Sequence, residues 1–302
     1  MVKKKLLIVG GTGFLGRHIL IKSIQLGFKS TSISLNQIDK KKKLQGVKYL
    51  KIDIREKKQL DKLKEKFDYV INASGYGGFY KNSNISKSLD TQFEGLKNLA
   101  SKFLNKKIKK FIQIGSSLEY GVNKSPNNEK MIPKKPLTNY GESKLNSTNY
   151  LLLLNKFFNF PAIIFRLYQV YGPSQGNNRL VGYIVNSIKN NKHIYVTKGN
   201  QVRDFLYVSD FVDAIFLALK NKRLEGEVIN IGFGKGYKVK DIINKIIKLF
   251  PNKKIKIFKT KKSKKEQKKL YPKIQKARIL LNWKPQVSLE DGLTKILFKS
   301  NG

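Results

Sequence analysis

Near its N-terminus the chain reads Leu6-Leu7-Ile8-Val9-Gly10-Gly11-Thr12-Gly13-Phe14-Leu15-Gly16. Four apolar residues ended by glycines predict a short buried strand, and apolar residues at helical spacing over 14–26 predict a helix after it. Glycines at 10, 13 and 16 allow a tight turn, close approach of a pyrophosphate and close helix–strand packing. The helix N-terminus offers free N–H groups to an anion. We therefore predict a dinucleotide-binding loop, whose candidate residues are Gly10, Thr12, Gly13, Phe14, Leu15 and Gly16.

Predicted strands and helices alternate along the first half of the chain. The strands are 6–9, 30–35, 47–52, 69–72, 110–114 and 162–167, and the helices are 14–26, 59–66, 85–104 and 140–158. This alternation predicts βαβ units and a parallel sheet with right-handed crossovers. Later helices are predicted at 180–189, 208–219, 239–249 and 289–298, with another strand at 227–231. We assign residues 1–168, with 204–231 returning to them, to a dinucleotide-binding domain, and residues 169–203 and 232–302 to a smaller lobe.

The 302 residues include 62 Lys and Arg against 20 Asp and Glu, a net charge of +42. Only seven of the basic residues are Arg, and the lysines are spread in short runs along the chain. Proteins that read nucleic acids rely on Arg for bidentate contacts, so we predict no specific nucleic-acid partner and keep a nucleic-acid-binding protein as the alternative class. The absence of Cys excludes disulfides, thiolate metal sites and a Cys nucleophile, and two distant His give no metal site. The apolar runs are too short for a signal core or a membrane span, which predicts a cytoplasmic protein without membrane contact.

The second and third predicted strands end at the adenosine side of such a site. Asp53 would lie beside the adenine and Ile54 against its ring, although Asp53 could equally cap the helix that follows. The second strand ends at Asn36, where NAD sites often carry an acid that bonds the ribose 2′-hydroxyl. With Asn36 in that place and lysines at 40–43, we predict NADP as the favoured cofactor and NAD as a possible one.

A third set of residues has the composition of an acid–base site. Tyr140 and Lys144 are four residues apart and share a helix face, so the ammonium group should lower the pKa of the phenol. Ser116 follows the strand 110–114 at its carboxyl end, the edge at which an open α/β sheet binds ligands. We therefore expect Ser116 to face the same crevice as the glycine loop.

Together these segments resemble the extended short-chain dehydrogenase/reductase family, in its NAD-dependent epimerase/dehydratase group. Residues 166–173 (RLYQVYGP) and 203–210 (RDFLYVSD) are similar to two further motifs of that family, and the resemblance covers nearly the whole chain. It implies an α/β fold, namely a Rossmann doubly wound parallel sheet with a smaller C-terminal substrate-binding lobe. It also implies a homodimer, in which the helices at 85–104 and 140–158 pair with their copies.

The resemblance assigns roles to matching positions. Tyr140 looks like the catalytic acid/base, Lys144 tunes it and holds the nicotinamide ribose, and Ser116 positions the reacting oxygen. Arg203 and Arg179 would grip the diphosphate of a nucleotide-sugar, and Gln169 stands where the family usually has Asn. The implied cofactor contacts add Asn36, Asp53, Ile54, Ala73, Tyr140 and Lys144 to the loop, and the implied substrate contacts are Ser116, Ser117, Tyr140, Gln169, Arg179 and Arg203.

The same resemblance limits the reactions that the chain could catalyse. The family's dehydratases carry acids that drive loss of water where this chain has Ser117 and Leu118, and Glu119 lies one residue later. Dehydration is therefore disfavoured. We expect an NAD(P)-dependent reduction at C4 of a 4-keto-6-deoxyhexose linked to CDP, dTDP or GDP, similar to the reductases that make CDP-abequose. The alternative is an NAD-dependent nucleotide-sugar 4-epimerase.

Overall fold

The computed structural model describes residues 3–75, 89–260 and 267–298. Its centre is a parallel sheet of seven strands in the order β11-β6-β5-β4-β1-β2-β3. This order confirms the doubly wound parallel sheet. Strands β2 and β3 follow β1 on one side and strands β4, β5, β6 and β11 lie on the other, so the strand order switches between β1 and β4. Such sheets bind ligands at this switch point. The strands are β1 (Lys5–Val9), β2 (Lys29–Ser34), β3 (Val47–Lys51), β4 (Tyr69–Asn72), β5 (Lys110–Ile114), β6 (Ala162–Leu167) and β11 (Val228–Ile231).

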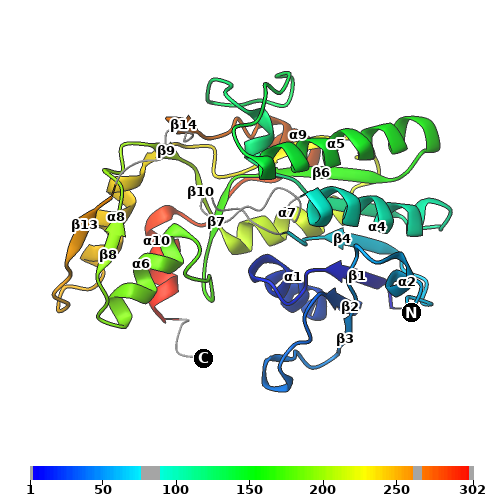
Figure 1. Ribbon diagram of the computed structural model, residues 1–302, viewed down its shortest axis with the longest axis horizontal. Coiled ribbons are helices and arrows are strands. Elements are labelled where there is room, and N and C mark those ends of the chain that lie inside the picture. Colours follow the sequence, from blue (N-terminus) through cyan, green and yellow to red (C-terminus); the bar gives the residue numbers. More distant parts are fainter. Residues whose placement is uncertain (1–2, 76–88, 261–266, 299–302) are drawn as a thin grey trace.

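Helices cover both faces of this sheet (Figure 1). One face packs against α1 (Phe14–Gln25), α7 (Val208–Lys220) and α9 (Gln275–Leu281), in a core that includes Ile19, Phe211 and Trp283. The other face packs against α2 (Lys57–Leu60), α4 (Gly95–Leu104) and α5 (Asn139–Phe158), in a core that includes Leu99 and Leu151. Strands covered on both sides consist almost wholly of buried residues, which explains their continuous apolar runs.

A smaller lobe lies beside the sheet, at the left of Figure 1. Its own core joins α6 (Leu180–Lys189), α8 (Val239–Lys248) and α10 (Leu289–Phe298) around residues such as Ile184, Ile242 and Leu293. Two short parallel pairs belong to this region, namely β7 (Gln169–Tyr171) with β10 (Phe205–Tyr207) and β8 (Ile194–Val196) with β13 (Ile257–Lys259). A three-stranded sheet adds β9 (Val202–Arg203), β12 (Tyr237–Lys238) and β14 (Lys269–Leu270).

The sequence prediction is wrong for one helix. The expected helix over 59–66 forms only as α2, because the chain after Leu60 continues in i→i−3 turns that bury Leu63 and Phe67. In the expected helix over 85–104, residues 85–88 lie outside the described part. From Asp90 to Glu94 the chain forms a π-helical turn, and α4 follows it. The short helix α9 was not predicted. No helix in the described part of the chain is long and apolar enough to cross a membrane.

Candidate active site

The glycine loop has room for a ligand at one of its glycines only. Gly10 has φ +80°, which strains any L side chain, and a Cβ on Gly16 would overlap the Gly10 carbonyl oxygen. A Cβ on Gly13 would meet only that carbonyl oxygen within 4 Å, at 3.3 Å, so the space before Gly13 holds no other described protein atom that close. Gly13 is also the N-cap of α1, whose first turn carries no acidic residue. These features fit a dinucleotide diphosphate at the helix N-terminus.

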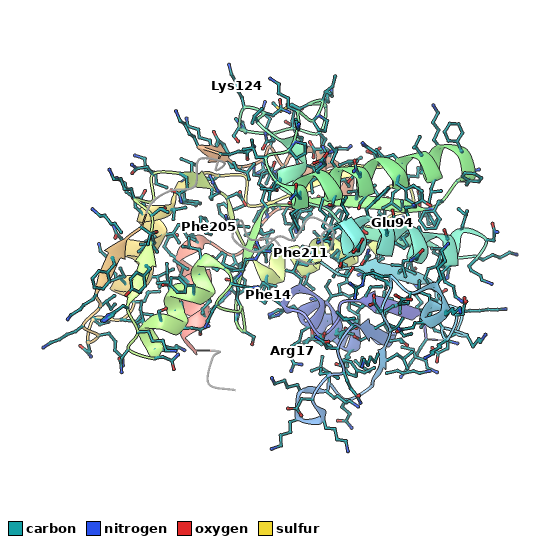
Figure 2. The ribbon with its side chains drawn as sticks, in the orientation of Figure 1. Phe14, Arg17, Glu94, Lys124, Phe205 and Phe211 are labelled. Carbon is teal, nitrogen blue, oxygen red and sulfur yellow. The ribbon has the colours of Figure 1, made fainter. Side chains whose placement is uncertain are left out.

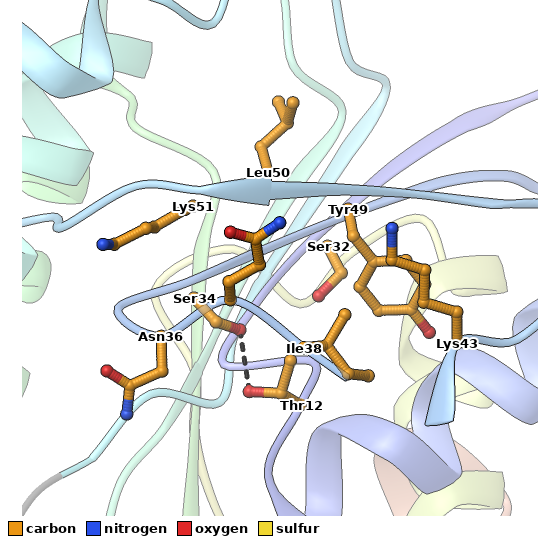
Figure 3. A pocket seen from close by; sticks show the side chains of 10 residues that line it. Thr12, Ser32, Ser34, Asn36, Ile38, Lys43, Tyr49, Leu50 and Lys51 are labelled. Atoms are coloured by element: carbon orange, nitrogen blue, oxygen red, sulfur yellow. Dashed lines mark hydrogen bonds between the residues drawn. The ribbon is translucent and has the colours of Figure 1, made fainter. Parts of the chain in front are cut away.

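A cavity of about 130 Å³ lies at the ends of β1, β2 and β3 (Figure 3). The Thr12 hydroxyl donates a hydrogen bond to Ser34 Oγ there, at 3.0 Å, and Ser32 Oγ is buried with no hydrogen-bond partner among the described residues. An unpaired buried hydroxyl in a ligand cavity is suited to bind a ligand's polar atom. The lining holds two lysines and no carboxylate, and consists of Thr12, Ser32, Ser34, Asn36, Gln37, Ile38, Lys43, Tyr49, Leu50 and Lys51.

Two predicted adenine contacts have partners inside the protein. The Asp53 carboxylate lies 2.6 Å from the Arg55 guanidinium, and this hydrogen bond lowers the pKa of Asp53. The N-cap of α2 is Glu56, so the alternative in which Asp53 caps that helix is wrong. Ile54 is buried in the core beneath α4. Ala73, which follows β4, is half-buried, and its carbonyl oxygen lies against Gly10.

A second cavity, of about 290 Å³, lies where the sheet meets the smaller lobe. Phe14 at the start of α1 and Phe205 on β10 are both in its wall, at the junction of the two parts in Figure 2. The cavity brings together residues from five separate segments, all of them predicted to bind substrate: Ser116, Ser117, Tyr140, Gln169, Arg179 and Arg203. Whether they bind it stays a prediction.

Tyr140 lies in the first turn of α5, which Thr138 caps through a 3.1 Å hydrogen bond from Gly141 N. Burial raises the pKa of Tyr140, the positive charge of Arg179 lowers it, and a hydrogen bond with Ser116 lowers it as well. The Lys144 ammonium is 5.8 Å from the centre of the Tyr140 ring and donates instead to the Ile114 carbonyl oxygen, at 2.8 Å. The expected lowering of the phenol pKa by Lys144 is therefore wrong for this structure, because burial dominates and Arg179 is the cation that opposes it.

Lys144 itself is only 2% exposed. Burial lowers the pKa of Lys144 to about 8, against the opposing charge of Glu119. A lysine with this pKa is still mostly charged at neutral pH, and a partner that binds the ammonium form would favour its protonation further.

The arginine end of the cavity contains a residue that the motifs did not indicate. Arg203 is 6% exposed and donates to the carbonyl oxygens of Val202 and Gln267, at 2.8 and 2.9 Å. Gln267 also lines the cavity, and its side-chain oxygen is buried without a partner among the described residues. It lies at the end of a lysine-rich segment with no motif, so nothing local in the sequence pointed to it.

Glu119 lies outside this cavity wall, whereas Ser117 and Leu118 belong to it. The carboxylate of Glu119 is fully buried and accepts hydrogen bonds from Ser116 N at 2.7 Å, Arg166 Nε at 2.8 Å and the Thr148 hydroxyl at 2.9 Å. Among the described residues, the cavity lining thus presents no carboxylate that could drive loss of water.

The comparisons with known proteins agree with this arrangement. Residues 6–232 match the NAD dependent epimerase/dehydratase family. The chain belongs to this family. It is therefore an enzyme of a family whose members are NAD-dependent nucleotide-sugar epimerases and dehydratases.

Three similar proteins illustrate the range of the family. A protein of Methanocaldococcus jannaschii named "Putative UDP-glucose 4-epimerase" is 29% identical, over 97% of each chain. The dTDP-D-glucose 4,6-dehydratase of Homo sapiens is 24% identical, over 97% of this chain and 89% of the relative. The crystal structure of UDP-glucuronic acid 4-epimerase from Bacillus cereus, in complex with UDP-glucuronic acid and NAD, has a TM-score of 0.87 at 25% identity and covers 98% of both chains.

Proposed function

We propose that this family member is a nucleotide-sugar 4-epimerase. The observation that carries the proposal is the composition of the larger cavity, in which Tyr140 and Ser116 share a wall with Ser117 and Leu118. In the described part of the chain, this wall offers an acid–base phenol for a sugar hydroxyl and no carboxylate for eliminating water. The similarity to epimerases over nearly the full chain supports the same reaction.

The chain's own residues supply proton transfer and orientation. In its phenolate form Tyr140 would take the proton of the sugar C4 hydroxyl and then return that proton to the same oxygen, while the Ser116 hydroxyl holds the oxygen by a hydrogen bond. Lys144 would hold the ribose of the nicotinamide nucleotide, with the Gly13 end of α1 at its diphosphate. When bound, the nicotinamide supplies reversible hydride transfer at C4.

Two arginines and two amides would bind the rest of the substrate. Arg203 and Arg179 provide the positive charge for the sugar-linked diphosphate, since a guanidinium binds phosphate through paired hydrogen bonds. Gln169 and Gln267 line the same cavity and offer amide groups to the sugar or the base. The experiment below identifies the nucleoside diphosphate of the substrate, whether UDP, CDP, dTDP or GDP.

A second candidate function rests on the smaller cavity. Asn36, Lys43 and Lys51 line it without a carboxylate, a lining that suits the 2′-phosphate of NADP. NADP preference would favour net reduction of a 4-keto-6-deoxyhexose over epimerisation, since a reductase consumes a freely exchanging reduced cofactor.

One experiment separates these reactions. Purified protein is incubated with NAD and a panel of nucleoside-diphosphohexoses, and the C4 epimers are resolved by chromatography and proton NMR. Parallel samples receive NADPH and nucleoside-diphospho-4-keto-6-deoxyhexoses, followed by nicotinamide absorbance. Epimer formation without net change in the cofactor supports the epimerase, and stoichiometric loss of NADPH supports the reductase. A 4-keto-6-deoxy product from a nucleoside-diphosphohexose would contradict both.

We also propose a homodimer that pairs α4 and α5 with their copies. Leu96, Leu151 and Leu154 on these helices pack in the protomer's own core. Leu153, Phe157 and Phe158 near the end of α5 stay 53%, 64% and 61% exposed. An isologous contact between two copies of α5 would cover these three side chains. The cytoplasmic location and the domain boundaries remain predictions.

A further inference from the structure

Glu119 connects three parts of the site without entering its cavity. Its Oε1 accepts a hydrogen bond from Ser116 N at 2.7 Å, and its Oε2 accepts one from the Thr148 hydroxyl at 2.9 Å. Thr148 follows Tyr140 and Lys144 at steps of four residues on α5, and so lies on their face of the helix. One carboxylate therefore bonds both the loop that carries Ser116 and the helix that carries the acid–base pair.

The local structure holds Glu119 in this position. Ser116 and Glu119 form a capping box on the 3₁₀ turn Ser117–Tyr120, in which the Ser116 side chain accepts from the backbone and the Glu119 side chain accepts from Ser116 N. Arg166 on β6 donates to Oε2 at 2.8 Å, with both side chains at 5% exposure or less. A side chain on Gly115 would collide with Glu119 Oε1, so the glycine before Ser116 leaves room for the carboxylate.

We propose that Glu119 is a positioning residue that fixes Ser116 relative to α5 and supplies the buried negative charge facing Tyr140 and Lys144. The proposal rests on the proposed function for the roles of those residues. It also gives this glutamate a role different from the elimination acids of dehydratases, because its carboxylate touches protein groups only and lies behind the cavity wall.

The charges around Tyr140 and Lys144 determine in which direction the pKa of Lys144 moves when Glu119 loses its charge. The negative charge of Glu119 raises the pKa of both Tyr140 and Lys144, while Arg179 lowers the pKa of Tyr140. Arg166 faces the carboxylate from β6, with its guanidinium over the Tyr120 ring, and the pKa of Arg166 is raised by Glu119 despite burial. Replacing Glu119 by a neutral residue should therefore lower the pKa of Lys144 further below about 8.

The test compares Glu119→Gln with Glu119→Asp and Thr148→Val. Glu119→Gln removes the charge at nearly constant shape, and the other two keep the charge and disturb the geometry. The first readout is the pH dependence of nicotinamide nucleotide binding, followed by NADH or NADPH fluorescence, with Lys144→Met as the variant that lacks the titrating ammonium. We expect the alkaline midpoint of binding to fall by about one pH unit in Glu119→Gln and to stay near the wild-type value in Glu119→Asp and Thr148→Val.

Turnover provides the second readout. We expect kcat to fall by about tenfold or more in Glu119→Asp, with KM nearly unchanged, because the shorter side chain displaces Ser116 from the reacting oxygen, and to fall less in Glu119→Gln, whose amide oxygen still accepts from Ser116 N. If Glu119→Gln fails to fold because Arg166 loses its counter-charge, the double variant Glu119→Gln/Arg166→Gln replaces it and should move the midpoint in the same direction by a smaller amount, because it removes a positive charge together with the negative one.

An unmoved midpoint in folded Glu119→Gln or in the double variant would overturn the proposal and leave Glu119 a purely structural residue. Wild-type kcat in folded Glu119→Asp would overturn it as well. Because binding is measured without turnover, a wild-type protein that binds the nucleotide but converts no sugar would contradict the proposed function and still allow Glu119 to be tested.

Discussion

The ammonium nitrogen of Lys144 lies 5.8 Å from the ring centre of Tyr140 and is hydrogen-bonded to the carbonyl oxygen of Ile114. One turn of α5 brings the two residues onto the same face, yet the ammonium does not touch the phenol oxygen. The groups that lower the pKa of the phenol are Arg179, through its positive charge, and Ser116. In this state of the protein Tyr140 is thus a protonated acid, and Lys144 is a buried cation with a lowered pKa.

Tyr140→Phe should abolish turnover and leave the cofactor affinity intact. The ring fills the same space, but the variant lacks the proton donor, and a general acid–base group contributes about 10²- to 10⁴-fold to the rate. The assay is product formation at saturating substrate, with nucleotide binding measured on the same preparation. A variant that keeps more than about a tenth of the wild-type rate would disprove the acid–base assignment.

Gly13→Val should remove dinucleotide binding in a protein that still folds. The added Cβ meets one protein atom, the Gly10 carbonyl oxygen at 3.3 Å, and otherwise takes the space that we assign to the diphosphate. The matched variant Gly16→Val should instead lower the melting temperature strongly, because its Cβ would overlap that carbonyl oxygen. An unchanged nucleotide titration in folded Gly13→Val would count against this loop as the binding site.

Cofactor binding should weaken as the pH rises through about 8. The folded-state pKa of Lys144 is lowered from 10.5 to about 8, so the ammonium that would bind the ribose is present below that pH and is lost above it. Loss of a hydrogen bond from a charged group should raise Kd by about tenfold. In Lys144→Met the Kd should already be high at pH 7, and its alkaline dependence should be absent. Equal pH dependence in both proteins would assign the titration to another group.

If the second candidate function is correct, NADP should bind at least several-fold more tightly than NAD, in opposition to the proposed epimerase. Asn36 provides no carboxylate to accept the 2′-hydroxyl or repel a 2′-phosphate, and Lys43 and Lys51 line the same cavity. Added salt should weaken the part of the NADP affinity that the two lysines contribute. Asn36→Asp should shift the preference towards NAD, which calorimetric titration with both nucleotides would measure. A wild-type preference for NAD would reject this prediction and strengthen the epimerase over the reductase.

The double variant Leu153→Glu/Phe157→Glu should convert a dimer into a monomer. Both side chains are more than half exposed on α5, and two charges at an isologous apolar contact would face two more across the axis. Ile279→Glu is the control, since Ile279 is 71% exposed on α9, away from the proposed contact. Light scattering at micromolar concentration gives the mass. A monomeric wild-type protein would exclude the proposed interface.

Much of the fold follows from local patterns in the sequence. The helices Leu180–Lys189 and Leu289–Phe298 begin and end at the predicted residues, because their apolar spacing and flanking breakers lie within the helix or beside it. The glycine loop was predictable for the same reason, since a tight turn between a strand and a helix needs glycines at nearby positions. The early end of α2 at Leu60 could not be predicted, because a longer helix and a series of turns would both bury Leu60, Leu63 and Phe67. The spacing of these apolar residues does not distinguish the two conformations.

Local sequence patterns were enough to predict the alternating strands and helices of the seven-stranded sheet, the glycine loop and the shared helix face of Tyr140 and Lys144. The partners of the site residues depend on the completed fold: Arg55 binds Asp53, Ile114 accepts from Lys144, Gln267 lines the larger cavity and Glu119 lies buried against Arg166. Most of these partners lie on separate elements, up to 47 residues apart in the case of Glu119 and Arg166. Backbone conformation is governed by near neighbours in the chain, whereas burial and the pKa of a side chain are governed by whichever groups the completed fold places around it.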